Sequence, residues 1–361
     1  FLAPHGRVVV LERESQPGHH STGRSAALFS ETYGPAQVRA LSRASRAFLE
    51  HPPEGFADAP ILGARGALMV GGPDDGAALE AELSVLQRIS PEVRRVSANE
   101  VIATVPVMRA DTTGDAILEP GACDIDVHTL HQGFLRGLKR RGGSVECGVA
   151  VDAIERVATG WVVHGAGRRW HASVLVNAAG AWADVVAGLA GVRPIGLQPK
   201  RRSAFTFAPP AGIDPRAWPA VIALDESWYI KPDAGVLLGS PANADPVEPH
   251  DVVAEELDIA IAIDRIERAT TLSIRRPIRT WAGLRSFVAD GDLVGGPDPQ
   301  DPAFVWVAAQ GGYGIQTSAA MGEACAALAR GAPIPAHLAA HGLDAAMLGA
   351  ARLHPPHAPS R

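Results

Sequence analysis

The sequence contains little cysteine, and its cysteines form no pattern typical of a metal centre or a disulfide framework. Cys123, Cys147 and Cys325 are the only three among 361 residues, and they lie far apart. They include no CxxC pair, and their odd number argues against a set of disulfide bonds. We therefore expect three reduced, mostly buried thiols in a cytoplasmic protein, and no metal site.

Long apolar runs and an excess of positive charge are also absent. No run approaches the roughly 18 apolar residues of a membrane span, and a net charge of −6 gives no basic field for nucleic acid. The 47% of hydrophobic and 20% of charged residues are typical of a globular protein with a sizeable core. These features predict one large domain or two interleaved ones. A cytoplasmic location is expected, with a position peripheral to the inner membrane as the alternative.

The beginning of the sequence lacks the glycine fingerprint of dinucleotide-binding folds. Phe1–Ala3 is typical of the end of a helix, and Val8–Leu11 predicts a short strand buried on both faces. Parallel strands need a crossover helix before them. We therefore expect a strand and a glycine-rich loop upstream of Phe1, so that the sequence is an N-terminally truncated part of a longer protein.

The order of the predicted elements indicates an α/β protein with two interleaved domains. Parallel βα units surround blocks of consecutive strands, above all from Arg202 to Ser240, where Pro232–Gly235 predicts a hairpin turn. Helices are predicted over 37–49, 77–89, 317–328 and after the capping residue Asp126. This order favours a Rossmann-like domain formed by residues 1–49, 121–196 and 281–361, with a mainly antiparallel domain formed by 50–120 and 197–280.

Two segments near the N-terminus contain the residue types that a dinucleotide requires. Glu12 ends the first strand, where an acidic residue accepts hydrogen bonds from a ribose, or is an ordinary strand-end carboxylate. His20–Ala27 supplies hydroxyls, backbone donors and one arginine, which suit phosphates at a helix start. A plain capping loop is the alternative for that segment.

Two later segments place small residues directly after buried strands. Asn177–Trp182 allows close approach of a cofactor to the backbone, although tight strand–helix packing also explains it. Gln310–Thr317 puts three glycines between a strand and a helix, so that backbone N–H groups and a helix N-terminus favour negative charge. The N1–C2=O side of a reduced flavin has such a charge, and a tight glycine turn is the alternative.

These segments, in this order, resemble the D-amino-acid oxidase and glycine oxidase superfamily of FAD-dependent enzymes, and within it most closely the bacterial D-arginine dehydrogenases. The similar stretches are Val8–Ala27, Asp124–Gly137, Val174–Ala208, Leu224–Pro249 and Trp281–Glu323. The resemblance implies an FAD-binding domain with an interleaved substrate domain. It implies noncovalent FAD, because residues 281–290 lack the cysteine to which some relatives attach flavin. The implied cofactor contacts are Glu12, Arg13, Ser21, Thr22, Gly23, Arg24, Ser25, Ala26, Ala27, Val151, Ala179, Gly180, Gly311, Gly312, Tyr313, Gly314, Ile315 and Gln316.

The resemblance also implies a set of substrate contacts. Arg285 and Arg202 would bind the carboxylate of an amino acid through charge-assisted hydrogen bonds, assisted by Tyr229. Tyr33 corresponds to a tyrosine on a mobile lid, and the Gly312 carbonyl would accept a hydrogen bond from the substrate amine. Hydride would pass from Cα to flavin N5 without an obligatory general base, and the imino acid would hydrolyse to a 2-oxo acid and ammonia.

Three positions depart from the D-arginine dehydrogenase pattern. The glutamate that pairs with the substrate guanidinium corresponds to Ala67, an active-site histidine to Leu28, and a pocket methionine to Ala220. A buried cationic side chain without its carboxylate costs several kcal/mol, so we expect apolar D-amino acids to be favoured over D-arginine. Oxidation of a secondary amine such as sarcosine, and a catalytically incompetent fragment, are the alternatives. The electron acceptor, O₂ or a quinone, stays open.

Overall fold

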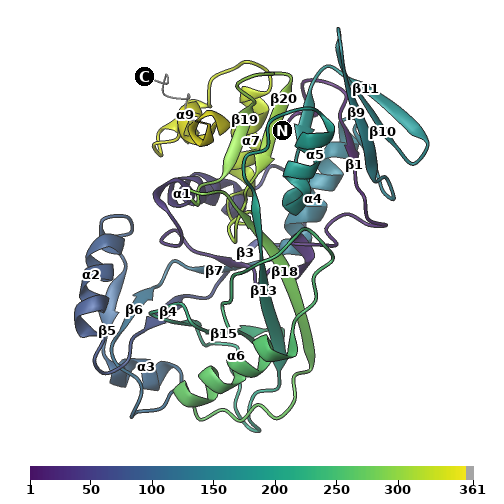
Figure 1. Ribbon diagram of the computed structural model, residues 1–361. Coiled ribbons are helices and arrows are strands. Elements are labelled where there is room, and N and C mark those ends of the chain that lie inside the picture. Colours follow the sequence, from purple (N-terminus) through teal and green to yellow (C-terminus); the bar gives the residue numbers. More distant parts are fainter. Residues whose placement is uncertain (355–361) are drawn as a thin grey trace, which may run out of the picture.

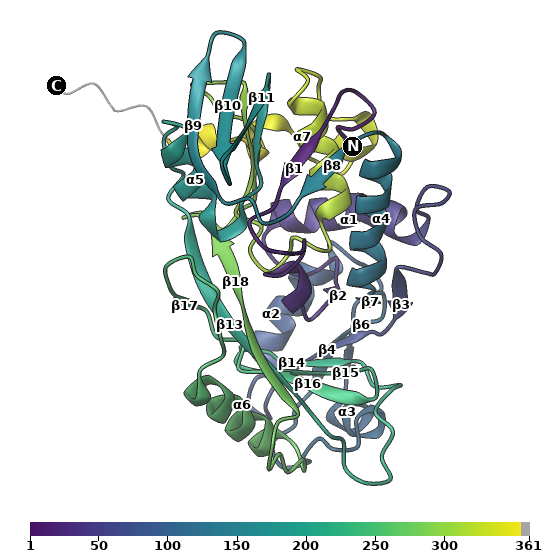
Figure 2. The ribbon, with the colours of Figure 1, turned by 90° about the vertical axis from the view of Figure 1, so that its right-hand side faces the viewer.

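The computed structural model describes residues 1–354, and two long strands run through its middle. β13 (Gln198–Phe207) and β18 (Arg279–Phe287) pair antiparallel along their lengths, from Gln198 opposite Phe287 to Thr206 opposite Arg279. They connect an upper and a lower lobe in the view of Figure 1, and Figure 2 shows β18 rising from the lower lobe toward α5 (Ala183–Leu189). The site lies where these strands pass between the lobes.

The lower lobe is built on a sheet of nine strands. Its order is β17-β13-β16-β15-β14-β4-β6-β5, with β18 on the free side of β13. All neighbours are antiparallel except β4 and β14, so the expected mainly antiparallel domain is confirmed. The predicted hairpin turn is present, and Ala234 and Gly235 both have positive φ, as a tight two-residue turn requires. The bounds are β4 (Ala67–Val70), β5 (Arg94–Val96), β6 (Ala116–Glu119), β14 (Ala220–Ala223), β15 (Tyr229–Asp233), β16 (Val236–Ser240), β17 (Asp245–Pro246), α2 (Gly76–Gln87), α3 (Ala98–Thr104) and α6 (Glu256–Ala269).

The upper lobe combines small sheets with helices. β12 and β20 pair in parallel and β19 joins β20 antiparallel, while β9, β10 and β11 form an antiparallel meander. A short sheet of β2, β7 and β3 lies toward the lower lobe. The strands are β1 (Val9–Leu11), β2 (Leu28–Phe29), β3 (Leu62–Ala64), β7 (Cys123–Ile125), β8 (Ser144–Glu146), β9 (Val151–Val157), β10 (Gly160–Gly165), β11 (Arg168–Ala172), β12 (Leu175–Asn177), β19 (Val294–Pro297) and β20 (Phe304–Ala308). The helices are η1 (Thr22–Arg24), α1 (Ala36–Glu50), α4 (Val127–Arg140), η2 (Gly180–Trp182), α5, α7 (Ser318–Leu328), α8 (Ala336–Ala339), α9 (Ala345–Leu348) and η3 (Ala350–Leu353).

The helices with strong sequence signals form where they were predicted. The Asp126 carboxylate accepts a hydrogen bond from the Thr129 N–H at 2.8 Å, which caps α4 as expected. α1, α2 and α7 each lie within two residues of their predicted bounds. The α/β architecture expected from the sequence is confirmed.

Predictions for the first eleven residues and for the cysteines were partly wrong. Phe1–Gly6 forms a turn instead of a helix end, and β1 is not buried: Val9 is 38% and Val10 42% exposed. The parallel pairing of β1 is correct, but within residues 1–354 its partner is β8 alone, so no further strand covers it. Cys325 is buried, whereas Cys123 is half-buried and Cys147 is exposed.

The five expected domain segments stay a prediction. β18 crosses the expected boundary between 280 and 281, yet all of it pairs with β13. Residues 355–361 of the last segment lie outside the described residues. Among residues 1–354, no helix combines the length and the apolar character needed to cross a bilayer.

Candidate active site

Two cavities meet between the lobes. The larger, of about 340 Å³, lies among η1, α4, the start of α7 and the strands β13 and β18. The smaller, of about 170 Å³, lies between the lower sheet and the segment 25–34. Both are bordered by Ser25, Ala26, Arg202, Tyr229, Arg285, Gly312 and Ile315.

The larger cavity contains most of the expected cofactor contacts. Those that border it are Ser21, Thr22, Arg24, Ser25, Ala26, Gly180, Gly311, Gly312, Gly314 and Ile315. These residues are far apart in sequence, so the fold brings them together as expected. Whether they bind the cofactor stays a prediction.

The start of α7 fits the electron-rich side of a flavin. The Ser318 hydroxyl is buried there without a hydrogen-bond partner and borders the larger cavity. A Cβ added to Gly312 would come within 2.7 Å of an Arg285 nitrogen, so a residue with a side chain would clash with Arg285 at this position. The dipole of a helix N-terminus favours negative charge, although the N–H groups of Thr317, Ser318 and Ala320 already donate to Tyr313, Ile315 and Ser45. Ser318 was missed, although it directly follows the predicted glycine turn.

His131 of α4 was also missed. Its ring borders the larger cavity, and burial, assisted by His128, lowers its pKa. A neutral imidazole therefore faces the cavity. A histidine in an amphipathic helix gave no signal of this position.

Other expected cofactor contacts lie outside the larger cavity. Ala27 and Gln316 border the smaller one. Glu12 follows β1 and accepts a hydrogen bond from the Glu14 N–H at 2.9 Å, and the Arg13 guanidinium lies 4.8 Å from the Trp182 ring centre. Neither described cavity is bordered by Glu12, Arg13, Gly23, Val151, Ala179 or Tyr313.

Two arginines without a carboxylate partner border both cavities. The Arg202 Nε donates to the Asn243 carbonyl oxygen at 2.5 Å, and an Arg285 nitrogen donates to the Tyr33 hydroxyl at 3.4 Å. Neither takes part in any ion pair among residues 1–354. Burial, and then the positive charge of Arg285, lower the pKa of Arg202. Two half-buried guanidiniums that repel each other form a site for an anion.

The lower sheet provides one wall of the smaller cavity, which we term the pocket floor. Residues that alternate along a strand point to the same face, and four strands each contribute a pair to it. Register places Ala67 between Glu119 and Ala220, and Met69 between Ile117 and Ile222. The pocket floor consists of Ile117 and Glu119 of β6, Ala67 and Met69 of β4, Ala220 and Ile222 of β14, and Tyr229 and Lys231 of β15.

The three expected specificity positions come together in this pocket. Ala67 and Ala220 pack against each other and against Leu28 of β2. Glu119 and Lys231 were missed, because their approach depends on the order of strands that are distant in sequence. Lys231 is 5% exposed, and its ammonium pairs with Asp124 at 2.7 Å.

The three tyrosines of the sequence gather at this site. Tyr33 and Tyr229 border the smaller cavity, and the Tyr313 ring lies 5.1 Å from that of Tyr33 in an edge-on arrangement. Burial raises the pKa of Tyr313 to about 12. The expected substrate residues Tyr33, Arg202, Tyr229, Arg285 and Gly312 thus lie around one space.

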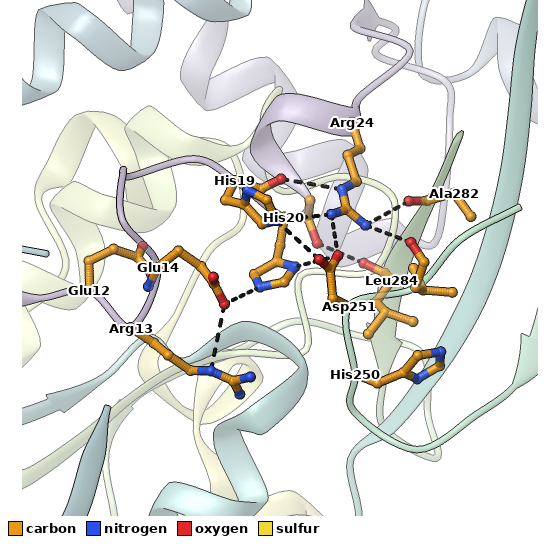
Figure 3. A network of polar contacts seen from close by, with 12 residues as sticks. Glu12, Arg13, Glu14, His19, His20, Arg24, His250, Asp251, Ala282 and Leu284 are labelled. Carbon is orange, nitrogen blue, oxygen red and sulfur yellow. Dashed lines mark hydrogen bonds and ion pairs between the residues drawn. The ribbon is translucent and has the colours of Figure 1, made fainter. Parts of the chain in front are cut away.

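A polar network covers the outer side of η1 (Figure 3). The Arg24 guanidinium donates to the carbonyl oxygens of Val252 and Ala282, at 2.8 and 3.1 Å, and pairs with Asp251. The hydrogen bond from Arg24 lowers the pKa of Asp251 to about 2. Arg24 was expected to contact phosphate, but these partners already occupy much of its guanidinium.

Glu14, His19 and His20 lie in the same network. Their ligand-type atoms are within 4.8 Å of one another, and the His20 Nε2 lies 2.9 Å from the Glu14 carboxylate. The hydrogen bond with His20 lowers the pKa of Glu14. The nearby Arg24 charge disfavours a cation at this position.

Comparison with known proteins identifies the family. The model of the FAD dependent oxidoreductase family, DAO, matches residues 1–328. The chain belongs to this family. As a DAO-family member it uses FAD, and the glycine-rich start of α7 with its unpartnered Ser318 hydroxyl, on the border of the larger cavity, suits a flavin.

Solved structures of similar fold include several amine and amino-acid oxidoreductases. Glycine oxidase from Geobacillus kaustophilus has 20% identity and a TM-score of 0.79, covering 92% of this chain and 90% of that one. Iminodiacetate oxidase from Chelativorans sp. BNC1 has 22% identity and a TM-score of 0.77, covering 92% of both chains. L-proline dehydrogenase from P. horikoshii has 19% identity and a TM-score of 0.75, covering 91% and 88%. At these identities the likeness concerns the fold.

Proposed function

We propose that this DAO-family protein oxidises D-amino acids to imino acids, which hydrolyse in water to 2-oxo acids and ammonia. The observation that supports this most is the pair of half-buried arginines, Arg202 and Arg285, where the two cavities meet. Their unpaired donors suit one carboxylate placed between the cofactor cavity and the side-chain pocket. The D-arginine dehydrogenase resemblance supports the D configuration.

The residues around the arginines would orient the rest of the substrate. Tyr33 and Tyr229 provide hydroxyls beside the carboxylate, and the Gly312 carbonyl provides an acceptor for the amine. Bound FAD supplies an acceptor for the hydride that leaves Cα. No aspartate, glutamate or histidine is needed as an obligatory base if the amine loses its proton on binding.

The pocket floor supports a preference for apolar side chains. Ala67, Ala220 and Leu28 present small or aliphatic groups to the space. Glu119 lies beside Ala67, but its carboxylate already accepts three hydrogen bonds. A guanidinium beside Ala67 would therefore have to compete with these donors for the Glu119 carboxylate.

Substrate profiling with the full-length, FAD-loaded protein tests this function. We expect kcat/KM at least tenfold higher for D-leucine and D-methionine than for D-arginine and D-lysine, and ammonia as a product. Activity on D-arginine equal to that on D-leucine would contradict the side-chain preference. Activity confined to L-amino acids would contradict the stereochemistry. Ala67→Glu is the matched variant, and it should raise the rate on D-arginine relative to D-leucine.

Oxidation of a secondary amine is the second candidate. The arginine pair binds a carboxylate whether the amine beside it is primary or secondary. Sarcosine and iminodiacetate in the same assay distinguish the two, because a secondary amine releases a substituted amine instead of ammonia. Assays with O₂, read as hydrogen peroxide, and with a soluble quinone identify the electron acceptor.

A further inference from the structure

One buried carboxylate bonds to three consecutive residues of the segment that leads to Tyr33. Glu119 ends β6 and is 7% exposed. Its Oε2 accepts hydrogen bonds from the hydroxyls of Ser30 at 2.7 Å and Thr32 at 2.6 Å. Its Oε1 accepts one from the Glu31 N–H at 2.9 Å. All three donors belong to the stretch between β2 and Tyr33.

No cation accounts for the burial of this charge. None of the ion pairs formed within residues 1–354 includes Glu119, and Lys231 on the same floor pairs with Asp124 instead. A buried carboxylate is costly unless hydrogen bonds stabilise it. The three donors from Ser30, Glu31 and Thr32 provide that stabilisation. The Glu119 carboxylate is therefore stabilised by Ser30–Thr32, and the same hydrogen bonds hold Ser30–Thr32 against the sheet.

The same segment is also bonded to the upper lobe. The Ser30 N–H donates to the Gln316 side-chain oxygen at 3.1 Å, and Gln316 in turn donates to the Ser42 hydroxyl at 2.8 Å. Glu31 pairs with Arg46 of α1 at 2.5 Å. Segment 30–32 thus lies between the lower sheet and the cofactor side, with Glu119 as its contact to the sheet.

Tyr33 follows directly and reaches the arginine pair. Its hydroxyl accepts a hydrogen bond from Arg285 at 3.4 Å, and its ring packs on Tyr313. Gly34 has φ of +87°, and an added Cβ would come within 3.0 Å of both Tyr313 and Val38. The chain therefore turns sharply after Tyr33, so the position of this side chain depends on the three residues before it.

We propose that Glu119 is a positioning residue, which fixes Ser30–Thr32 against the pocket floor so that the Tyr33 hydroxyl meets the substrate carboxylate beside Arg285. This inference rests on the proposed function for the role of Tyr33 as a substrate contact. Glu119 itself touches the segment and does not bind the substrate side chain.

Glu119→Gln in the full-length, FAD-loaded protein is the first test. The amide keeps the size of the side chain but replaces one acceptor oxygen with a donor, which opposes one or two of the three donors of the segment. We expect KM for D-leucine to rise roughly tenfold, as for loss of one charged hydrogen bond. We expect kcat to stay within about twofold, because binding that is equal in ground and transition states affects KM alone. An unchanged KM overturns the positioning role.

A double-mutant cycle shows whether Glu119 acts through Tyr33. Tyr33→Phe should raise KM by itself, and adding Glu119→Gln should raise it little further, because coupled residues are not additive. Fully additive effects overturn the proposal. Glu100→Gln is the matched control: Glu100 also accepts hydrogen bonds from a backbone N–H and a hydroxyl, both of Ser97, but it lies at the surface on α3. This control should leave KM unchanged.

Two further measurements separate this inference from its rivals. If Glu119 binds a cationic substrate side chain, Glu119→Gln raises KM for D-lysine and not for D-leucine, and the positioning role is wrong. Chymotrypsin cleavage after Tyr33 requires no substrate turnover. Cleavage should be several-fold faster in Glu119→Gln than in the parent and Glu100→Gln proteins. Faster cleavage without activity on any amino acid refutes the proposed function while supporting the anchored segment, and equal cleavage rates refute the anchoring.

Discussion

Arg201 and Arg202 are consecutive residues of β13, but the two faces of the strand give them opposite surroundings. Arg201 bonds to Asp258 at 2.9 Å and also pairs with Glu255 and Asp245. Arg202 has the Asn243 carbonyl oxygen and no carboxylate among the described residues. Although burial opposes it, the hydrogen bond with Asp258 raises the pKa of Arg201, whereas burial lowers that of Arg202. The first face stabilises the fold, and the second leaves a charge available for a ligand.

The largest effect that distinguishes the two faces should be on turnover. Arg202→Met should lower kcat/KM for D-leucine at least about 30-fold, since it removes a buried partner of the substrate carboxylate. Arg201→Met should lower it less than about fivefold, because its partners belong to α6, the N-cap of α6 and β17. Steady-state kinetics of the two variants measure the difference. Similar losses of kcat/KM in both variants would contradict the assignment of a structural role to Arg201 and a ligand-binding role to Arg202.

For stability, Arg201→Met should have the larger effect and Arg202→Met the smaller one. Arg201→Met leaves Asp258 buried without its cation, which should lower the free energy of unfolding by about 3 kcal/mol. Arg202→Met removes a half-buried charge that has no carboxylate partner among residues 1–354, so the protein should be equally or more stable. Urea unfolding of the flavin-loaded variants, followed by circular dichroism, provides the measurement. Marked destabilisation by Arg202→Met would mean that the second face is structural too.

A smaller effect concerns Tyr313, whose ring packs on that of Tyr33. Its pKa is raised from 10.0 to about 12 in the folded protein. Its contribution to stability is therefore fully present below pH 10 and is lost as the pH rises through about 12. Absorbance at 295 nm should show one tyrosine of three ionising near pH 12, and Tyr313→Phe should remove this component. A Tyr313→Phe titration identical to that of the parent protein would contradict the burial of this hydroxyl.

Local signals in the sequence predicted much of the fold and some of the site. The Asp126 cap, the turn at Ala234-Gly235 and the amphipathic pattern of α1 depend on neighbouring residues, and each was predicted. The exposure of Val9 and Val10 was not predicted, because an apolar run does not show whether other elements pack against it. The arginine pair was found through the family resemblance, since Arg202 and Arg285 are 83 positions apart and meet only because β13 pairs with β18.

Glu119 shows why the rest could not be predicted. Alternation along β6 places Ile117 and Glu119 on one face, but nothing in that strand tells which face borders a cavity. The answer depends on β4, β14 and β15, which join the sheet from elsewhere in the sequence. A charged residue at the end of an otherwise apolar strand is the one signal that points to it.

The pocket floor has a consequence for how such enzymes diverge. Each strand contributes its own side chains to the floor. The backbone hydrogen bonds that join the strands do not involve those side chains. A single codon change at Ala67 or Ala220 therefore alters the chemistry of the pocket and leaves the arginine pair on β13 and β18 in place. A substitution on the floor can therefore change which substrate side chain the pocket accepts without removing the groups that would bind the carboxylate.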